Sequence, residues 1–266
     1  MRILVGQSRA SPGPTRQLAC DRVVQTGWGP RGVIIGAEQQ SLSTLVLAGG
    51  SGQRFNGFPK AFLTAAGRTL LEHAVEQARQ FGSEVIVGLP TDRVEEGRAL
   101  VGDVATVIEG GLTREETIEV LVSATTADHV LIHDVARPLA GDALFRKVID
   151  VGLETGAATA ARPYVVRDAI GLSSDGILET GVDRDRVVSL QTPCLFRRDM
   201  LVTALERSAA EGWTDPGIAT LVARAGFDVH LVETDEDNVK VTYPEDWDSV
   251  RAILEGVGQD TPDTII

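Results

Sequence analysis

The stretch LAGGSGQRFNGFPKAFL (residues 47–63) ends a short apolar run abruptly in a loop rich in glycine. The run leading into it, TLVLA, is apolar and partly β-branched, which predicts a buried β-strand. Gly49, Gly50 and Gly52 follow, and residues without a Cβ let backbone N–H groups turn toward an anion. The loop lacks the Gly-Lys-Ser/Thr of a Walker A motif and the third glycine of a dinucleotide fingerprint. It predicts an anion site at a strand end, with a bare structural turn as the alternative.

Two cations in the same loop favour the anion site. Arg54 and Lys60 lie close to the glycines, and a pair of positive charges suits a triphosphate better than a single carboxylate. Of the 25 basic residues only Lys60, Lys147 and Lys240 are lysine. In a chain that uses arginine almost everywhere, we interpret a lysine as a position that needs a compact ammonium group. The alternatives are solvated surface charges and chance.

Composition excludes several classes of function. The 266 residues are 43% hydrophobic and 24% charged, which is typical of a globular protein with a substantial core. The net charge of −13 argues against nucleic acid or an anionic membrane as a partner, because both need a basic surface. Cys20 and Cys194 are too few for a disulfide framework or a metal cluster. With no long apolar run and no apolar segment typical of a secretion signal, we expect a cytoplasmic protein without a membrane span.

Strand-like and helical patterns alternate from Ser43 onward. The apolar runs that predict strands are residues 44–48, 84–89, 104–109, 129–134 and 156–161. The segments with helical periodicity are residues 69–81, 91–101, 113–125 and 141–154. Alternation at this spacing implies right-handed crossovers. We therefore predict an α/β fold, a Rossmann-like, mostly parallel sheet flanked by helices.

The alternation breaks after Pro163. Short strand-like pieces surround the turn signal SSDG, which predicts a projecting β-hairpin arm at about residues 164–190. The predicted elements beyond the arm are a helix, two strands and a final helix, at residues 197–212, 227–233 and 238–242 and from Pro244 onward.

Two terminal segments fall outside the pattern. Residues 1–40 carry breakers such as SPGPT and show little periodicity, so we expect a weakly ordered N-terminal extension. Residues 259–266 are typical of a flexible tail. One domain, residues 41–258, remains between them.

Polar residues follow the strand predicted at residues 129–134. His133, Asp134 and Arg137 stand at or just beyond its carboxyl end, where open parallel sheets bind ligands. The Asp134 carboxylate suits a magnesium ion carried by a nucleotide, reached directly or through water. A structural role is the preferred interpretation of His133.

The segment EGGLTREETIEV follows another predicted strand. Gly111 permits close backbone approach, as recognition of a flat base edge requires, and Thr117 falls inside the next helix. Thr113 followed by Glu116 predicts a capping box at the start of that helix. Capping and base recognition are compatible.

Eight short motifs occur in order between about Thr44 and Trp247: LAGGSGQRF, PKAFL, GGLTREETI, HDVARP, VDR, QTP, TD and NVKVTYPEDW. With this set the chain resembles the 2-C-methyl-D-erythritol 4-phosphate cytidylyltransferase family and its relatives, the ribitol 5-phosphate cytidylyltransferases. The resemblance covers roughly three quarters of the chain. It implies an enzyme that joins CMP from CTP to a phosphorylated polyol and releases pyrophosphate.

The resemblance also assigns roles to residues. Arg54 and Lys60 match the groups that stabilise the pentavalent transition state, and Lys240 matches a lysine that reaches the phosphates from the opposite side. The residues that match nucleotide-binding positions are Ala48, Gly49, Gly50, Gly52, Gly111, Thr117, Asp134 and Arg137. The residues that match the acceptor pocket are Asp134, Arg184, Thr192, Thr214 and Lys240. Mg²⁺ beside Asp134 is the implied cofactor.

The resemblance further implies a homodimer. The hairpin arm would pack against its twin, and Arg184 would reach the active site of the neighbouring subunit. The chain departs from the family pattern in the arm and beside the acceptor motifs. Ala169 stands where a threonine is usual, TDPGI replaces TDDAS or TDEAS, and Cys194 stands where glutamine usually follows QTP.

Three other functions remain open at this point. The acceptor could instead be ribitol 5-phosphate or another sugar or polyol phosphate or phosphonate. A nucleotide-sugar glycosyltransferase would need an Asp-x-Asp element after a strand in the first half of the chain, which is absent there. A non-catalytic nucleotide-binding module would have no reason to keep Arg54, Lys60, Asp134 and Lys240 together.

Overall fold

The structure is a computed structural model that describes residues 41–50, 53–55, 57–165, 168–213, 217–234 and 238–256. The predictions for residues 1–40 and 259–266 lie outside these ranges, and so do those for Gly52 and Thr214. None of the helices within the described ranges has the length and apolar character to cross a membrane.

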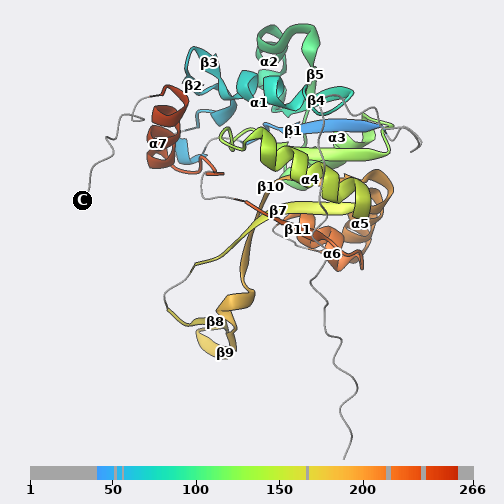
Figure 1. The fold of residues 1–266 in the computed structure, drawn as a ribbon, viewed down its shortest axis with the longest axis vertical. Helices are drawn as coiled ribbons and strands as arrows, with labels where there is room; N and C mark the ends of the chain where they lie inside the picture. Colours follow the sequence, from blue (N-terminus) through green and yellow to red (C-terminus); the bar gives the residue numbers. More distant parts are fainter. Residues whose placement is uncertain are drawn as a thin grey trace, which may run out of the picture. The chain divides into compact units, whose positions relative to one another are not determined.

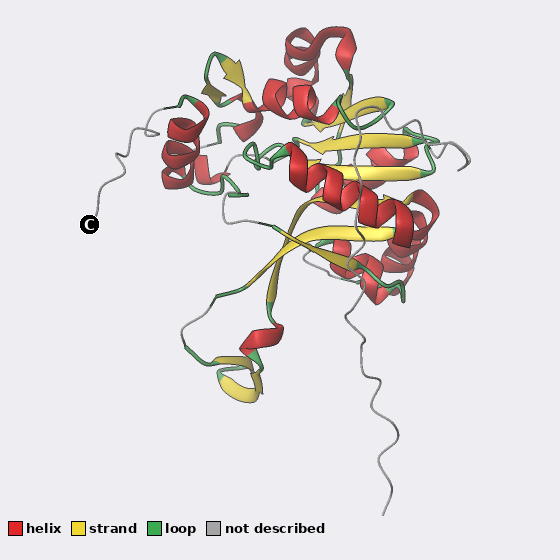
Figure 2. Cartoon of the chain, in the orientation of Figure 1, coloured by secondary structure: helices red, strands yellow, loops and turns green. Residues whose placement is uncertain are grey.

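A seven-stranded sheet forms the centre of the described chain, in the order β11-β7-β10-β6-β1-β4-β5 (Figures 1 and 2). Its strands are β1 (Leu42–Leu47), β4 (Glu84–Leu89), β5 (Thr106–Glu109), β6 (His129–Asp134), β7 (Ala157–Pro163), β10 (Val188–Arg197) and β11 (His230–Glu233). All neighbouring pairs are parallel except those of β10, which runs antiparallel to both β6 and β7. The predicted mostly parallel, Rossmann-like α/β fold is confirmed.

Helices pack on both faces of the sheet because the strands are apolar on both faces. They are α1 (Leu70–Ala78), α2 (Val94–Val101), α3 (Arg114–Ser123), α4 (Asp142–Thr155), α5 (Arg198–Glu211) and α6 (Ile218–Arg224), whereas α7 (Pro244–Leu254) packs with Ala136 and Val241 beyond the end of β6. On β1, Leu45 and Leu47 join the core formed with α3, α5 and α6, whereas Val46 joins the core formed with α1 and α2. The helix α4 covers β7 and β10. Successive residues of a strand therefore serve opposite cores.

Local sequence signals fix where the helices begin and end. Capping boxes start α1 at Thr69 and α3 at Thr113, as predicted for the latter. The helices α4 and α5 end at Gly156 and Gly212, whose positive φ values of 89° and 64° are left-handed conformations that glycine adopts at little cost. Pro244 starts α7, as predicted.

Two predictions about the C-terminal third are wrong. Residues 238–242 form no strand: Asn238 contacts β10 through its side chain, and Val241 N–H donates to the Ala136 carbonyl (2.8 Å) and not to a strand. The short helix α6 was not predicted, because its seven residues are too few for a periodic pattern to stand out.

The predicted hairpin arm is confirmed as a separate two-stranded sheet. The strands β8 (Ile170–Ser174) and β9 (Ile177–Val182) pair antiparallel. In the sequence they lie between the long strands β7 and β10, and in space they project beyond the ends of those strands (Figure 2). Asp175 and Gly176 both have positive φ, 51° and 79°, as a tight hairpin turn of the primed type requires. Large apolar side chains such as Ile177 and Leu178 are about 70% exposed on this arm.

Candidate active site

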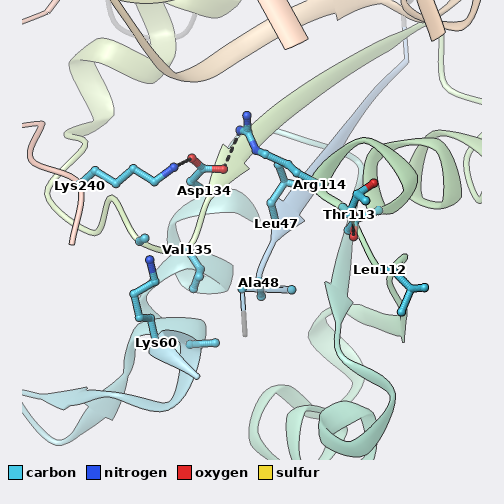
Figure 3. A pocket seen from close by; sticks show the side chains of 14 residues that line it. Leu47, Ala48, Lys60, Leu112, Thr113, Arg114, Asp134, Val135 and Lys240 are labelled. Carbon is cyan, nitrogen blue, oxygen red and sulfur yellow. Dashed lines mark hydrogen bonds and ion pairs between the residues drawn. The ribbon is translucent and has the colours of Figure 1, made fainter. Parts of the chain in front are cut away.

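A cavity of about 310 Å³ lies at the carboxyl ends of β1 and β6 (Figure 3). Parallel sheets place ligand sites at this edge, because the loops that follow neighbouring strands meet there. The glycine loop after β1 contributes Ala48, Gly49 and Gly50, and the end of β6 contributes Asp134. Lys60 and Lys240, which lie far apart in the sequence, line the same cavity. The structure therefore brings together residues that the sequence analysis selected separately.

Asp134 is the centre of the charged groups. Its carboxylate is only 9% exposed, and each oxygen accepts from a different cation. Arg114 Nη2 donates to Oδ1 and Lys240 Nζ donates to Oδ2, both at 2.8 Å (Figure 3). Burial alone would raise the pKa of Asp134, but the two cations outweigh it and hold that pKa well below its usual range. Asp134 is therefore ionised at neutral pH.

Arg114 is a site residue that the sequence analysis missed. It is the first residue of α3, directly after the cap residue Thr113, and the helix start carries its side chain to Asp134. Burial disfavours its charged form, yet the neighbouring Asp134 raises the pKa of Arg114. Arg114 lies inside the motif GGLTREETI, and this position is the feature of the sequence that could have identified it.

The two lysines approach the cavity from different elements. Lys60 begins a 3₁₀ turn (Lys60–Phe62) and donates through Nζ to the Val241 carbonyl at 3.1 Å. Figure 3 shows both ammonium groups directed toward the segment that contains Asp134 and Val135. Burial, followed by repulsion from Lys240, lowers the pKa of Lys60. A titratable group in a cavity whose pKa is shifted by burial and a neighbouring charge is a candidate functional residue, which supports Lys60 as one.

The glycine loop at Gly49 and the second glycine segment, Gly110-Gly111, both lie beside Thr117. The Thr117 hydroxyl accepts from Gly111 N–H (3.1 Å) and donates to the Thr113 carbonyl (2.8 Å). A Cβ on Gly49 would lie 3.5 Å from the Thr117 oxygen, and a Cβ on Gly111 would meet the Cβ of Glu116 and lie 2.8 Å from its carbonyl carbon. A larger residue at Gly111 would therefore clash with the start of α3 beside Thr117, whereas the contact at Gly49 is of ordinary van der Waals length.

A second cavity, of about 330 Å³, adjoins the first. Gln191, Thr192 and Arg137 line it, and the Thr192 hydroxyl accepts from Asp134 N–H at 3.1 Å. Arg114, Asp134 and Lys240 line both cavities. The charged cluster is thus the boundary between two adjacent binding spaces.

Comparison with known proteins identifies the family that uses this architecture. Residues 42–256 match the model of the 2-C-methyl-D-erythritol 4-phosphate cytidylyltransferase family. The chain belongs to this family. Because its members are cytidylyltransferases, the protein is a nucleotidyltransferase, and the predicted enzyme class is confirmed.

Individual relatives of the family agree. The 2-C-methyl-D-erythritol 4-phosphate cytidylyltransferase of Deinococcus radiodurans is 39% identical over 212 residues, which cover 79% of this chain and 88% of that protein. The protein of the same name from Aquifex aeolicus is 34% identical over 212 residues, covering 80% and 97%. The crystal structure of the Thermus thermophilus protein of this name has a TM-score of 0.65 and 31% sequence identity, covering 80% of this chain and 98% of that one.

Three basic residues expected in the site do not line the first cavity. The Arg54 guanidinium does not line the first cavity; it is stacked over the Tyr243 ring, 5.3 Å from the centroid, although its charge contributes to lowering the pKa of Lys60. Arg137, expected beside the nucleotide, lines the second cavity and donates to the Asn238 carbonyl at 2.6 Å. Arg184 lies on an exposed 3₁₀ turn (Arg184–Arg186) of the arm and lines neither cavity.

His133, next to Asp134, has the structural position that was expected. Its side chain is fully buried and packs against Phe145, with ring centroids 4.9 Å apart. Burial lowers the pKa of His133 to about 4, so the ring is neutral at physiological pH. Neither His133 nor Phe145 lines the two cavities.

The donor set around Asp134 fits a magnesium ion that arrives with a nucleotide. Within the described ranges no three His, Cys, Asp or Glu side chains gather as a metal-binding group. Among the described residues that line the first cavity, Asp134 is the single carboxylate, and both its oxygens already accept from cations. Magnesium commonly takes one or two protein carboxylates and fills its remaining positions with phosphate oxygens and water. The single described carboxylate of this cavity is consistent with that mode of magnesium binding.

Proposed function

We propose that the protein transfers the cytidylyl group of CTP to the phosphate of 2-C-methyl-D-erythritol 4-phosphate and releases pyrophosphate. One observation carries the proposal: in a member of this family, two cavities meet at the cluster of Asp134, Arg114 and Lys240. The reaction needs a donor triphosphate and an acceptor phosphate side by side, and adjacent cavities with shared cations supply that arrangement.

The nucleotide is assigned to the first cavity. Backbone N–H groups of the loop at Gly49 and Gly50 would cradle phosphate oxygens, and the second glycine segment with Thr117 would hold the base. Lys60 and Lys240 would stabilise the charge that develops on the α-phosphoryl group. Arg54 belongs to the same loop and is proposed to join them from its position against Tyr243.

The acceptor is assigned to the second cavity. Thr192 and Arg137 would bind it there, with Thr214 as a further contact proposed from the family pattern. An acceptor phosphate is already anionic near neutral pH, because its second pKa is about 6. Its oxygen can therefore attack the α-phosphorus without a general base. The barrier lies in bringing two polyanions together, so positioning and positive charge supply the catalysis.

Asp134 is proposed to hold a Mg²⁺ ion that the nucleotide carries. The ion, when bound, neutralises charge on the phosphates. Asp134 is suited to hold it because its carboxylate is ionised and lies at the boundary of both cavities.

A homodimer through the arm is also proposed. The exposed apolar residues of β8 and β9 would be covered by the arm of a second subunit, which would direct Arg184 toward that subunit's acceptor. The cytoplasmic location expected from the sequence stays a prediction.

The decisive experiment is an assay of pyrophosphate release with CTP, MgCl₂ and a panel of acceptors. We expect release with 2-C-methyl-D-erythritol 4-phosphate at a kcat/KM at least tenfold above that with ribitol 5-phosphate or erythritol 4-phosphate. ATP and UTP in place of CTP, and omission of the acceptor, are the controls. Faster release with ribitol 5-phosphate would overturn the acceptor. Absence of release with every acceptor, under conditions where CTP binds, would overturn catalysis altogether.

A further inference from the structure

The two cations that pair with Asp134 differ in how firmly each is held. Arg114 starts α3, and the capping box between Thr113 and Glu116 fixes that helix end, with Glu116 N–H donating to the Thr113 hydroxyl at 3.1 Å. Lys240 lies in a segment without helix or strand; its side chain is 39% exposed and that of Arg114 34%, so the difference lies in the backbone that carries each side chain. An arginine anchored at a helix start is the more rigid partner of the two.

Lys240 is also placed to pair with a bound nucleotide in place of Asp134. It lines the first cavity together with Lys60, and Asp134 is the single acid among the described residues that line that cavity. A triphosphate that enters would offer Lys240 several negative oxygens in place of one carboxylate oxygen. Lysine is a point charge on a flexible four-carbon stem, so it can turn from one partner to another with little rearrangement of the backbone.

Asp134 cannot lose both partners without penalty. Its carboxylate is buried, and a buried charge left without a counterion is strongly unfavourable. Its backbone N–H is held by the Thr192 hydroxyl, so its position also affects the wall of the acceptor cavity. Arg114 is the group that can keep Asp134 paired and oriented after Lys240 has left.

We propose that Arg114 is a positioning residue: it holds the Asp134 carboxylate at the boundary between the two cavities while Lys240 exchanges that carboxylate for phosphate oxygens of the nucleotide. The inference rests on the proposed function only for the identity of the nucleotide. It adds a residue to the reaction and assigns the two cations different tasks, one fixed and one exchanging.

A crystal structure of the full chain with CTP and Mg²⁺ tests the exchange directly. We expect Arg114 Nη2 to remain within hydrogen-bond distance of Asp134 Oδ1. Lys240 Nζ should lie beyond ion-pair distance of Asp134 and within hydrogen-bond distance of a phosphate oxygen. The inference is wrong if Lys240 keeps its ion pair with Asp134 in the complex, or if Arg114 leaves the carboxylate for the nucleotide.

Variants test the consequence for the reaction. Arg114→Met should lower kcat on the order of 10²-fold, as small misplacements at a reacting centre do. The Kd for CTP measured by calorimetry should change less than about threefold, and Arg114→Lys should recover at least tenfold of the lost kcat. Arg98→Met is the matched control. Arg98 is also carried by a helix, α2, and pairs with an acid, Glu95, but it lines neither cavity. A loss in CTP affinity as large as the loss in kcat would contradict a positioning role.

A double-mutant cycle separates action through Asp134 from a general effect on folding. If Arg114 acts through Asp134, adding Arg114→Met to Asp134→Asn should lower kcat less than about threefold further. Multiplicative losses would overturn the inference. Where Asp134→Asn is too slow to measure, the CTP complex decides. A parent enzyme that binds CTP but transfers nothing refutes the proposed function, and the partner exchange is still read from the complex.

Discussion

Replacement of Lys60 by methionine is the sharpest test of the cationic cavity. Methionine keeps most of the length and volume of the side chain but removes the ammonium group. In the free protein that group belongs to a half-buried side chain and donates to the Val241 carbonyl at 3.1 Å. The expected loss concerns the chemical step, because the ammonium would face charge that grows in the transition state.

The magnitude follows from the setting of the ammonium. Two unit charges about 4 Å apart interact by about 4 kcal/mol at an effective dielectric constant of about 20, which suits a partly buried site. Removal of one donor to a developing oxyanion costs about 2.7–4 kcal/mol, or on the order of 10²–10³ in kcat. Both figures agree, so Lys60→Met should lower kcat by on the order of 10²–10³. The fold should survive, because burial already lowers the pKa of Lys60 and its charge is poorly solvated in the folded state.

The assay is steady-state pyrophosphate release at saturating CTP and acceptor, together with thermal unfolding. Lys147→Met is the matched control, since Lys147 is an exposed residue of α4 away from both cavities. It should leave kcat within twofold of the parent. A Lys60→Met enzyme with kcat within fivefold of the parent would remove Lys60 from the chemistry. A rise in the KM for CTP at unchanged kcat would show that Lys60 only binds the nucleotide.

Three further outcomes are expected. The pKa of Lys60 lies below its usual 10.5, so kcat/KM should fall on the alkaline side at a pH below 10.5. This alkaline limb should be missing from the residual activity of Lys60→Met. The stability of the fold should instead rise with pH, because the protonated amine is disfavoured in the folded state and this penalty is relieved as pH rises through the folded-state pKa. Gly111→Ala places a Cβ against Glu116, 2.8 Å from its carbonyl carbon, and should weaken CTP binding at least tenfold by calorimetry or lower the melting temperature, whereas Gly181→Ala, where a Cβ has open space, should leave CTP binding unchanged. Arg184→Ala should raise the KM for the acceptor with the Kd for CTP unchanged, and the reverse pattern in steady-state kinetics and calorimetry would refute its assignment.

Hydrophobic patterning was sufficient for the fold where a strand or helix is long. The strands at residues 84–89 and 129–134 were predicted with the bounds that the structure has, because each is a continuous run with a clear end, Pro90 after the first and the polar Asp134 at the end of the second. The segment at residues 238–242 failed for a tertiary reason. Its apolar alternation buries Val241 and presents Lys240, and within the described residues it joins no strand ladder, since its contact with β10 is made by the Asn238 side chain. Pattern alone cannot say whether a partner strand exists.

Site residues were predictable where their position follows from a strand end, and not where it depends on contacts with distant parts of the chain. The glycine loop, Lys60 and Asp134 follow strands, and the rule for parallel sheets places them at one edge. Arg114 was missed because its value comes from a contact 20 residues away that no local pattern encodes. Arg137 was assigned to the nucleotide from its motif, yet its side chain turns to the second cavity, because it pairs with the Asn238 carbonyl. Direction of a side chain depends on tertiary partners.

The position of an acid among these cations has a physical reason. The protein has a net charge of −13, so its positive groups attract a polyanion only where they are concentrated within short range, since salt screens charges beyond about 8 Å. Lysines concentrated without a counterion would repel one another, and repulsion from Lys240 is, after burial, a cause of the lowered pKa of Lys60. Asp134 limits it in the free protein by pairing with Lys240 and Arg114. An incoming triphosphate can replace one carboxylate oxygen as a partner and gain the attraction of the whole cluster, so the acid offsets the mutual repulsion of the cations before the substrate binds.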